Sequence, residues 1–389
     1  MPRRLKKAPE LYTLAPHRSF VDGLVQGIHA RFGDDPLTLS DVLILLPNRR
    51  AVRSLREAFL RHGGGKSLLL PRMEPIGDVD EDDLFLSGNL PQATWDMDLA
   101  PPIPSHMRQM LLMDIIGRWY HKRHELPPDV AQCAILAHAL GQFLDHVQTE
   151  DLTFRDLEKL VPSAYAAHWQ KTLDFLKILT EHWPNILTTT GFSDVAARRN
   201  TLLAALREKW LAEPPQHPII AAGSTGSIPA TAKLLGVIAR LPQGMVLLPG
   251  LDLSMDAESW ELLDDTHPQA TMKQLLSAIG TTRDVVENWL DDSGVSPDRL
   301  ARNQLLREVM RPAETTDRWR SLDLDLTAAM RGFVRLDAPG PREEAGMIAL
   351  MLREVLETEG KTAALVTSDR QLARRVAGEM KRWNILFDD

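Results

Sequence analysis

The stretch from residue 218 to residue 250 most strongly constrains the fold. A short apolar run at 218–222 leads into a Gly, Ser and Thr loop at 223–227, then a helical apolar pattern at 230–241 and a second apolar run at 245–248. Strands that are apolar throughout are typical of a parallel sheet covered on both faces. Ligands of such sheets bind outside the carboxyl ends of the strands. A nucleotide phosphate is therefore expected at the loop 223–227, if the chain binds one.

The composition is that of an ordinary globular protein. The 389 residues are 44% hydrophobic and 25% charged, enough for two or three domains. The net charge of −8 argues against a generally basic nucleic-acid binder, but it is compatible with a local basic surface. The single cysteine, Cys133, excludes a disulfide, a cysteine zinc site or an iron–sulfur cluster built by this chain alone. With no secretory signal and no apolar run near the roughly 20 residues of a membrane span, we expect a cytoplasmic protein without a membrane partner.

The apolar patterns predict an α/β domain built from two pieces, residues 1–104 and 213–260. Between them, residues 105–212 carry only amphipathic helix patterns, which predict an all-helical insertion. Before the insertion, strands are expected over 11–14, 41–47 and 68–71, and helices over 20–32 and 49–61. Within it, helices are expected over 107–121, 130–148, 153–160, 165–180 and 193–211.

The last part of the chain changes pattern near residue 330. Residues 261–329 are predicted to form a helical linker or subdomain, and residues 330–389 to begin a second α/β domain that is truncated as a strand ends. The expected helices of the linker are 271–278, 283–290 and 299–310. The expected strands of the second domain are 333–336, 362–367 and 385–387, around helices at 341–357 and 369–383.

Two stretches resemble parts of a nucleotide site without completing it. Gly65-Lys66-Ser67 ends a phosphate-loop pattern, but the first glycine of that pattern would fall on Leu60, and the stretch follows a helix rather than a strand. We interpret it as a linker that ends the helix. The loop at 15–19 has the right context, but it contains no Gly or Lys, and Pro16 lacks the N–H that a phosphate would need. Arg18 could contact an anion there.

The sequence predicts no metal site and no cofactor in this segment. The strand at 219–222 ends in alanine, where a nucleotidase would place the acid that holds its metal. The histidines and acids at 121–125 and 145–146 lack the spacing of zinc ligands, and we interpret them as solvated helix ends. The acids at 78–83 lack the interleaved glycine of a calcium loop and are expected to form an exposed acidic turn.

Basic residues at the carboxyl edge of the predicted sheet are the best candidates for nucleic-acid contacts. Arginines at 49, 50, 53 and 56 begin a helix whose N-terminal end faces this edge, where arginine suits phosphate contacts. A solvated helix face is the alternative, and the basic helix face at 370–382 has the same two interpretations. The candidate nucleic-acid-binding residues are Arg49, Arg50, Arg53, Ser224, Thr225 and Ser227.

Several motifs resemble the AddB subunit of bacterial AddAB helicase–nucleases in its alphaproteobacterial form. They are LILLPNRRA at 43–51, PIGDVDE at 75–81, AAGSTGSIPAT at 221–231, HPQ at 267–269, RPAETTDRW at 311–319 and AALVTSDR at 363–370. The resemblance spans essentially the whole chain. It implies a RecA-like, superfamily 1 helicase-like fold and the N-terminal portion of a longer subunit. In that family an iron–sulfur cluster belongs to a C-terminal nuclease domain, which nothing in this chain matches.

The resemblance also implies a role in processing DNA double-strand breaks before recombination. An AddA-like motor subunit would be the partner in a heterodimer, with DNA ends and single-stranded DNA as ligands. Where some family members keep a phosphate loop and an acid–glycine pair, this chain has residues 15–19 and Ala222-Gly223. We therefore expect a noncatalytic helicase-like segment. The alternatives are an ATPase with a degenerate loop around Arg18 and a protein-interaction scaffold without DNA contact.

Overall fold

A computed structural model describes residues 8–64, 69–76, 99–124, 126, 128–152, 172 and 174–387. The chain divides into two compact units, Met1–Ala329 and Met330–Asp389. The glycine–lysine stretch at 65–67, the acidic turn at 78–83 and the helix expected over 153–160 lie outside the described residues, as does half of the helix expected over 165–180.

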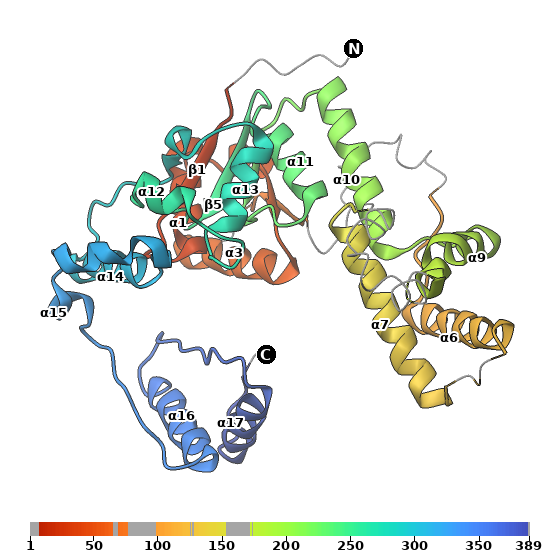
Figure 1. Cartoon of the computed structure of the whole chain (residues 1–389). Coiled ribbons are helices and arrows are strands. Elements are labelled where there is room, and N and C mark those ends of the chain that lie inside the picture. Colours follow the sequence, from red (N-terminus) through yellow and green to blue (C-terminus); the bar gives the residue numbers. More distant parts are fainter. Residues whose placement is uncertain are drawn as a thin grey trace. The chain divides into compact units, whose positions relative to one another are not determined.

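A six-stranded sheet forms the centre of the first unit (Figure 1). The strands are β1 (Leu11–Leu14), β2 (Leu43–Leu46), β3 (Arg72–Pro75), β4 (Ile219–Ala222), β5 (Gly244–Pro249) and β6 (Glu287–Asn288). Their order is β3-β2-β4-β5-β1-β6, and every neighbouring pair is parallel. The prediction of an α/β protein with a parallel sheet is confirmed.

Helices cover both faces of this sheet, which is why its central strands are apolar throughout. On one face, α1 (Phe20–Phe32) and α3 (Arg49–His62) pack against Ile44 and Leu46. On the other, the packing partners of Leu43 and Leu45 come from α10 (Val195–Ala212), α11 (Pro229–Ile238), α12 (Ala257–Glu261) and α13 (Ala270–Ile279). The short α2 (Pro36–Asp41) precedes β2.

The sequence of α3 explains its orientation. The side chain of Asn48 accepts a hydrogen bond from the N–H of Ala51 at 2.9 Å and so caps the first turn. Val52, Leu55 and Phe59 are buried at helical spacing. This apolar stripe faces the sheet and leaves the arginines of α3 on the outer side.

A second group of helices has a core of its own within the first unit. Its elements are α6 (Ser105–Lys122), α7 (Val130–Thr149), the short π-helix η3 (Ile178–His182) and α9 (Trp183–Thr190). Leu112, Ile116 and Trp183 lie at the centre. Oδ2 of the buried Asp194 carboxylate accepts hydrogen bonds from the indole N–H of Trp183 and from the side-chain amide of Gln148, each at 2.9 Å, and Oδ1 lies 3.4 Å from Arg108 Nε.

Two predictions about the edges of the sheet are wrong. The strand expected over 68–71 lies four residues later as β3, because the N–H of Arg72, not that of the apolar run, donates to Val42 O at 3.0 Å. The helix expected over 283–290 is instead a 3₁₀ turn, η4 (Arg283–Val285), followed by β6. Trp289 donates its backbone N–H to Thr13 O at 2.8 Å and buries its side chain, so pairing with β1 outweighs local helix formation.

The first unit ends with α14 (Pro297–Val309), η5 (Ala313–Ser321) and α15 (Leu326–Ala329). An ionic cluster, the Arg311 latch, fastens this segment to α12 and consists of Arg311, Asp256 and Glu308. The guanidinium of Arg311 donates two hydrogen bonds to Glu308, at 2.7 and 2.9 Å, and one to Asp256 at 2.6 Å. The side chains of Arg311 and Glu308 are each 9% exposed. Arginine suits this place because its planar fork meets a carboxylate with two parallel bonds.

The second unit contains α16 (Pro341–Val355) and α17 (Arg370–Arg382). They pack through small and apolar residues, with Ala349 against Val376 and Met380 in one cluster. The strands expected over 333–336, 362–367 and 385–387 are wrong: residues 330–387 contain no strand. A strand needs the N–H and C=O groups of a neighbour, and Val334, Val366 and Leu386, which are 73%, 93% and 96% exposed, have no such cover among the described residues.

None of the helices in the described part of the chain combines the length and the apolar character needed to cross a bilayer.

Candidate functional site

The strand order creates two places where neighbouring strands send their loops to opposite faces of the sheet. β2 continues into α3 on one face, while its neighbour β4 continues into α11 on the other. β1 continues into α1, while its neighbour β5 continues toward α12 and α13 on the opposite face. Such switch points open a crevice beyond the carboxyl ends of the strands, where ligands of α/β proteins bind.

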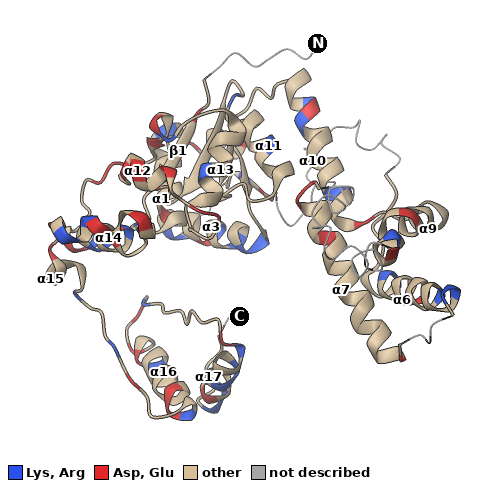
Figure 2. Ribbon diagram, viewed as in Figure 1, with Lys and Arg blue, Asp and Glu red and all other residues tan. Residues whose placement is uncertain are grey.

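The first switch point, between β2 and β4, contains the predicted arginines. Arg49 and Arg50 are the first two residues of α3, and their side chains are exposed. Figure 2 shows Lys and Arg positions in blue along the ribbon of α3. Arg53 lies one turn further along and is 80% exposed, with its Nε 3.4 Å from Glu57 Oε1. The exposed cations therefore continue from the crevice along the outer face of α3.

The loop after β4 approaches the end of β2 closely. Gly223 has a φ of 81°, and a Cβ added to it would lie 3.2 Å from the ring of Phe20 and 3.5 Å from the ring of Pro47. Glycine is needed because other residues rarely adopt this backbone conformation and would crowd these rings. The loop therefore lies beside Pro47, two residues before Arg49, so the structure brings the two predicted groups to one edge of the sheet.

The rest of this loop presents small hydroxyl side chains. Gly226, with a φ of 68°, donates its backbone N–H to Ser224 Oγ at 3.2 Å. Ser227 is exposed, whereas Ser224 and Thr225 are half-buried. Hydroxyls and the N-terminus of α3 can both donate hydrogen bonds to an anion, so the edge combines arginine charge with short-range donors.

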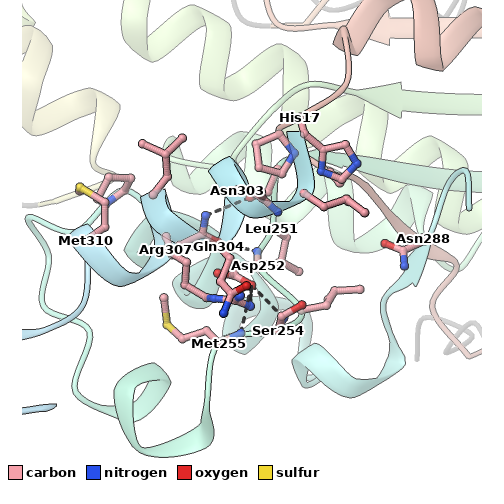
Figure 3. A pocket seen from close by; sticks show the side chains of 18 of the residues that line it. His17, Leu251, Asp252, Ser254, Met255, Asn288, Asn303, Gln304, Arg307 and Met310 are labelled. Carbon is pink, nitrogen blue, oxygen red and sulfur yellow. Dashed lines mark hydrogen bonds and ion pairs between the residues drawn. The ribbon is translucent and has the colours of Figure 1, made fainter. Parts of the chain in front are cut away.

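The second switch point, between β1 and β5, holds a cavity of about 360 Å³ (Figure 3). Its walls come from the loops after these two strands, from Asn288 beside β1 and from one face of α14. The side chains that supply its polar surface include His17, Asp252, Asn303, Gln304 and Arg307. The loop at 15–19, which contains His17, was identified from sequence, whereas the other members of this group were not. Asp252 lies three residues past β5, and Arg307 is separated from it by two further helices.

The loop after β1, which forms one wall of this cavity, is anchored to the turn at 291–293. His17 Nε2 lies 3.0 Å from Asp292 Oδ1, and the His17 side chain is 4% exposed. The guanidinium of Arg18 donates to the carbonyl oxygens of Asp291 and Ser293. Hydrogen bonds from the side chain and backbone of Ser293 lower the pKa of Asp291. Arg18, which from sequence could contact an anion, thus donates to backbone carbonyl oxygens.

The loop after β5 is fixed by Gln269 from the start of α13. The side chain of Gln269 accepts from the N–H of Asp252 at 3.0 Å and donates to Gly250 O at 2.9 Å. One carboxylate oxygen of Asp252 accepts the N–H groups of Ser254 and Met255, at 2.8 and 3.0 Å. These bonds to Oδ1 hold the carboxylate at the cavity wall.

His267 joins α14 to this loop as a neutral imidazole. Its Nδ1 accepts the backbone N–H of Gln269 at 3.0 Å, so its Nε2 carries the proton and donates to Met310 O at 2.8 Å. This bond fixes the end of α14 over the cavity.

No group of three or more His, Cys, Asp or Glu side chains among the described residues could hold a metal ion. Asp145, interpreted from sequence as part of a solvated helix end, forms an ion pair with Arg108 at 2.8 Å. No protein-family model and no curated protein matches the chain. Its function is therefore inferred from its own residues and geometry.

Proposed function

We propose that the chain is a noncatalytic, helicase-like part of a complex that repairs DNA double-strand breaks, where it guides and recognises single-stranded DNA and docks an AddA-like motor subunit. One observation carries the proposal: Arg49 and Arg50 lie at the same sheet edge as the glycine and hydroxyl loop at 223–227. The six-stranded parallel sheet is consistent with the RecA-like fold that the helicase-like interpretation requires.

This edge suits a phosphate backbone. Arginine forms bidentate bonds with phosphate, and a helix N-terminus adds N–H groups and a favourable dipole. The backbone of a single strand could pass along Arg49, Arg50 and Arg53, with Ser227 on the facing loop. The small side chains of that loop leave room for a close approach.

The noncatalytic part of the proposal is supported at the neighbouring strands. Pro16 lacks a donor in the loop after β1, and Arg18 is bound to carbonyl oxygens. Ala222 ends β4, so no carboxylate of that strand is available to hold a metal. A segment with this edge would position a strand while a partner supplies the hydrolysis.

The test is the binding of a fluorescent single-stranded oligonucleotide at several salt concentrations. Arg49→Ala combined with Arg50→Ala should weaken binding and reduce the slope of log affinity against log salt by about 1.4, because each single-strand phosphate contact contributes about 0.7. The matched control is Arg299→Ala combined with Arg320→Ala, which removes the same charge from exposed positions of α14 and η5. Equal slopes for the two double variants would exclude the site at β2 and β4.

A helicase-type ATPase is the second candidate, and the cavity at the carboxyl end of β1 favours it. A nucleotide that binds the folded chain would raise the melting temperature with Mg²⁺ and ATP, and Arg18→Ala would abolish that rise. We expect no rise, because the loop at 15–19 has neither the donors nor the lysine for a triphosphate.

A protein-interaction scaffold without DNA contact is the third candidate. The net charge of −8 and the exposed apolar side chains of the second unit, such as Val366 and Leu386, favour it. Titration of the whole chain with single-stranded DNA separates this candidate from the first, since a scaffold would show no salt-dependent binding.

A further inference from the structure

We infer that the cavity between β1 and β5 binds a single nucleobase. The base could belong to a DNA strand or to a free nucleoside. Binding of a base from a DNA strand rests on the proposed function, whereas binding of a free nucleoside does not. The cavity is separate from the edge of Arg49 and Arg50, because it lies at the other switch point of the sheet.

The size and position of the cavity suit a small ligand. About 360 Å³ lies within the range of small-molecule sites, and the crevice beside a switch point is where α/β sheets place them. The walls are preformed: Gln269 fixes the loop after β5, and His267 fixes the end of α14. A ligand would therefore not have to order these elements on binding.

A hydrogen-bond donor and an acceptor face the cavity side by side. Arg307 Nη1 lies 3.8 Å from Asp252 Oδ1, and Arg307 Nε lies 3.9 Å from Glu308 Oε1. Both distances are too long for hydrogen bonds. Within the described chain the Arg307 guanidinium therefore forms ion pairs, while its N–H groups remain available to donate hydrogen bonds to a ligand. Asp252 keeps one carboxylate oxygen beyond the two bonds its other oxygen accepts. The edge of a nucleobase carries the complementary pattern of adjacent donors and acceptors.

Side-chain amides extend this pattern. Asn303 lies one turn before Arg307 on the same face of α14, and Asn288 faces the cavity from beside β1 (Figure 3). Neither amide forms a side-chain hydrogen bond with another described residue. Asn and Gln read base edges because they offer a donor and an acceptor together. Leu251 and Met310 supply apolar wall against which a planar ring can pack.

The charge of the walls distinguishes a base from a phosphate. Arg307 is balanced by Asp252, and His17 is paired with Asp292, so neither side of the cavity has a clear excess of positive charge. A triphosphate would need several cations or backbone N–H donors, whereas a neutral heterocycle needs only the donors and acceptors present. The cavity therefore fits the base rather than the phosphates of a nucleotide.

The test uses the full chain with two kinds of probe. The first is a panel of unphosphorylated nucleosides, guanosine, adenosine, cytidine and thymidine, followed by ligand-detected NMR. The second is a short single strand compared with an abasic strand of the same length. Two variants, Arg307→Met and Asn303→Leu, each remove one recognition group. Asn303→Leu leaves the charge unchanged and the side-chain volume nearly so. Arg299→Met is the control, because it removes the same charge from an exposed position of α14 outside the cavity.

We expect at least one nucleoside to bind, with affinity reduced about tenfold or more by Arg307→Met and by Asn303→Leu and unchanged by Arg299→Met. If the strand supplies the base, the normal strand should instead bind more tightly than the abasic strand, and the same two variants should remove that advantage. Melting temperatures close to that of the unsubstituted chain would show that the variants fold. Absence of both effects, or equal losses in Arg299→Met, would overturn the inference. Salt-dependent strand binding through Arg49 and Arg50 could persist in that case, so failure here is distinguishable from failure of the proposed function.

Discussion

Replacing Arg311 by Met should open the Arg311 latch without disturbing the sheet. The substitution removes two hydrogen bonds to Glu308, one to Asp256 and one to Ser259 Oγ, and it leaves Glu308 buried beside an apolar side chain. Breaking a buried ion pair by removing one partner costs about 3–5 kcal/mol. Asp256 keeps Arg318 at 3.2 Å, and Glu308 keeps Arg307 at 3.9 Å, so we expect the lower end, about 3 kcal/mol.

Native-state hydrogen exchange measures this local opening directly. A loss of about 3 kcal/mol corresponds to roughly 150-fold faster exchange of the amides that the latch protects. The effect should be concentrated in α12 and η5, since Ser259 and Thr315 join these elements by a buried hydroxyl contact at 2.9 Å. Amides of β4 should keep their protection, because that strand lies in the centre of the sheet.

Two comparisons make the latch prediction refutable. Arg320→Met removes an exposed arginine of η5 and should leave exchange unchanged. Arg311→Met combined with Glu308→Leu should recover most of the lost protection, because no buried charge is then left without a partner. The reasoning fails if Arg311→Met matches the Arg320→Met control, or if removing Glu308 as well brings no recovery.

Further predictions concern pH and two glycines. Burial would raise the pKa of Asp256, but hydrogen bonds from Ser259 and Arg311 outweigh it and lower the pKa to about 2 from 3.8. Between these two pKa values the unfolded chain binds more protons than the folded chain, so the stabilisation by ionised Asp256 is present above about pH 4 and is lost as the pH falls toward 2. Arg311→Met should therefore flatten the acid limb of a curve of unfolding free energy against pH. Gly27→Ala should destabilise the fold by about 1–3 kcal/mol in thermal unfolding, because the new Cβ would lie 2.0 Å from Nε1 of the buried Trp289. Gly117→Ala in α6 meets nothing within 4 Å and should instead stabilise by up to about 1 kcal/mol; a lower melting temperature there would contradict the packing argument.

The central strands and the helices beside them were predictable because local pattern and tertiary packing agree. β2, β4 and β5 are apolar in sequence and buried on both faces in the structure. α3 begins where Asn48 predicts it, since the cap is a local interaction. The edges were less predictable: β3 contains Arg72 and Glu74, and β6 has only two residues, both exposed. Their pairing depends on neighbours far along the chain, which local periodicity does not encode.

The two switch points also differ in how far they could be predicted from sequence. Arg49, Arg50 and the glycine loop were identified from sequence because each follows a recognisable strand, and parallel strands end at one edge. The cavity escaped identification because Arg307 and Asn303 reach it from α14, which follows no strand of the sheet. That the first switch point binds nucleic acid and the second binds a nucleobase remain predictions, which the binding experiments test.

The position of β6 affects how the protein can be made. β1 pairs with β5 on one side and with Glu287–Asn288 on the other, so β1 acquires its neighbours only after these later strands have been synthesised. Contacts this distant in sequence slow folding, because a long loop must close before they contribute. During translation, Leu11–Leu14 would expose an unpaired strand capable of pairing with another nascent chain. Truncation between β5 and β6 should therefore give a product that aggregates, even though it retains the other five strands.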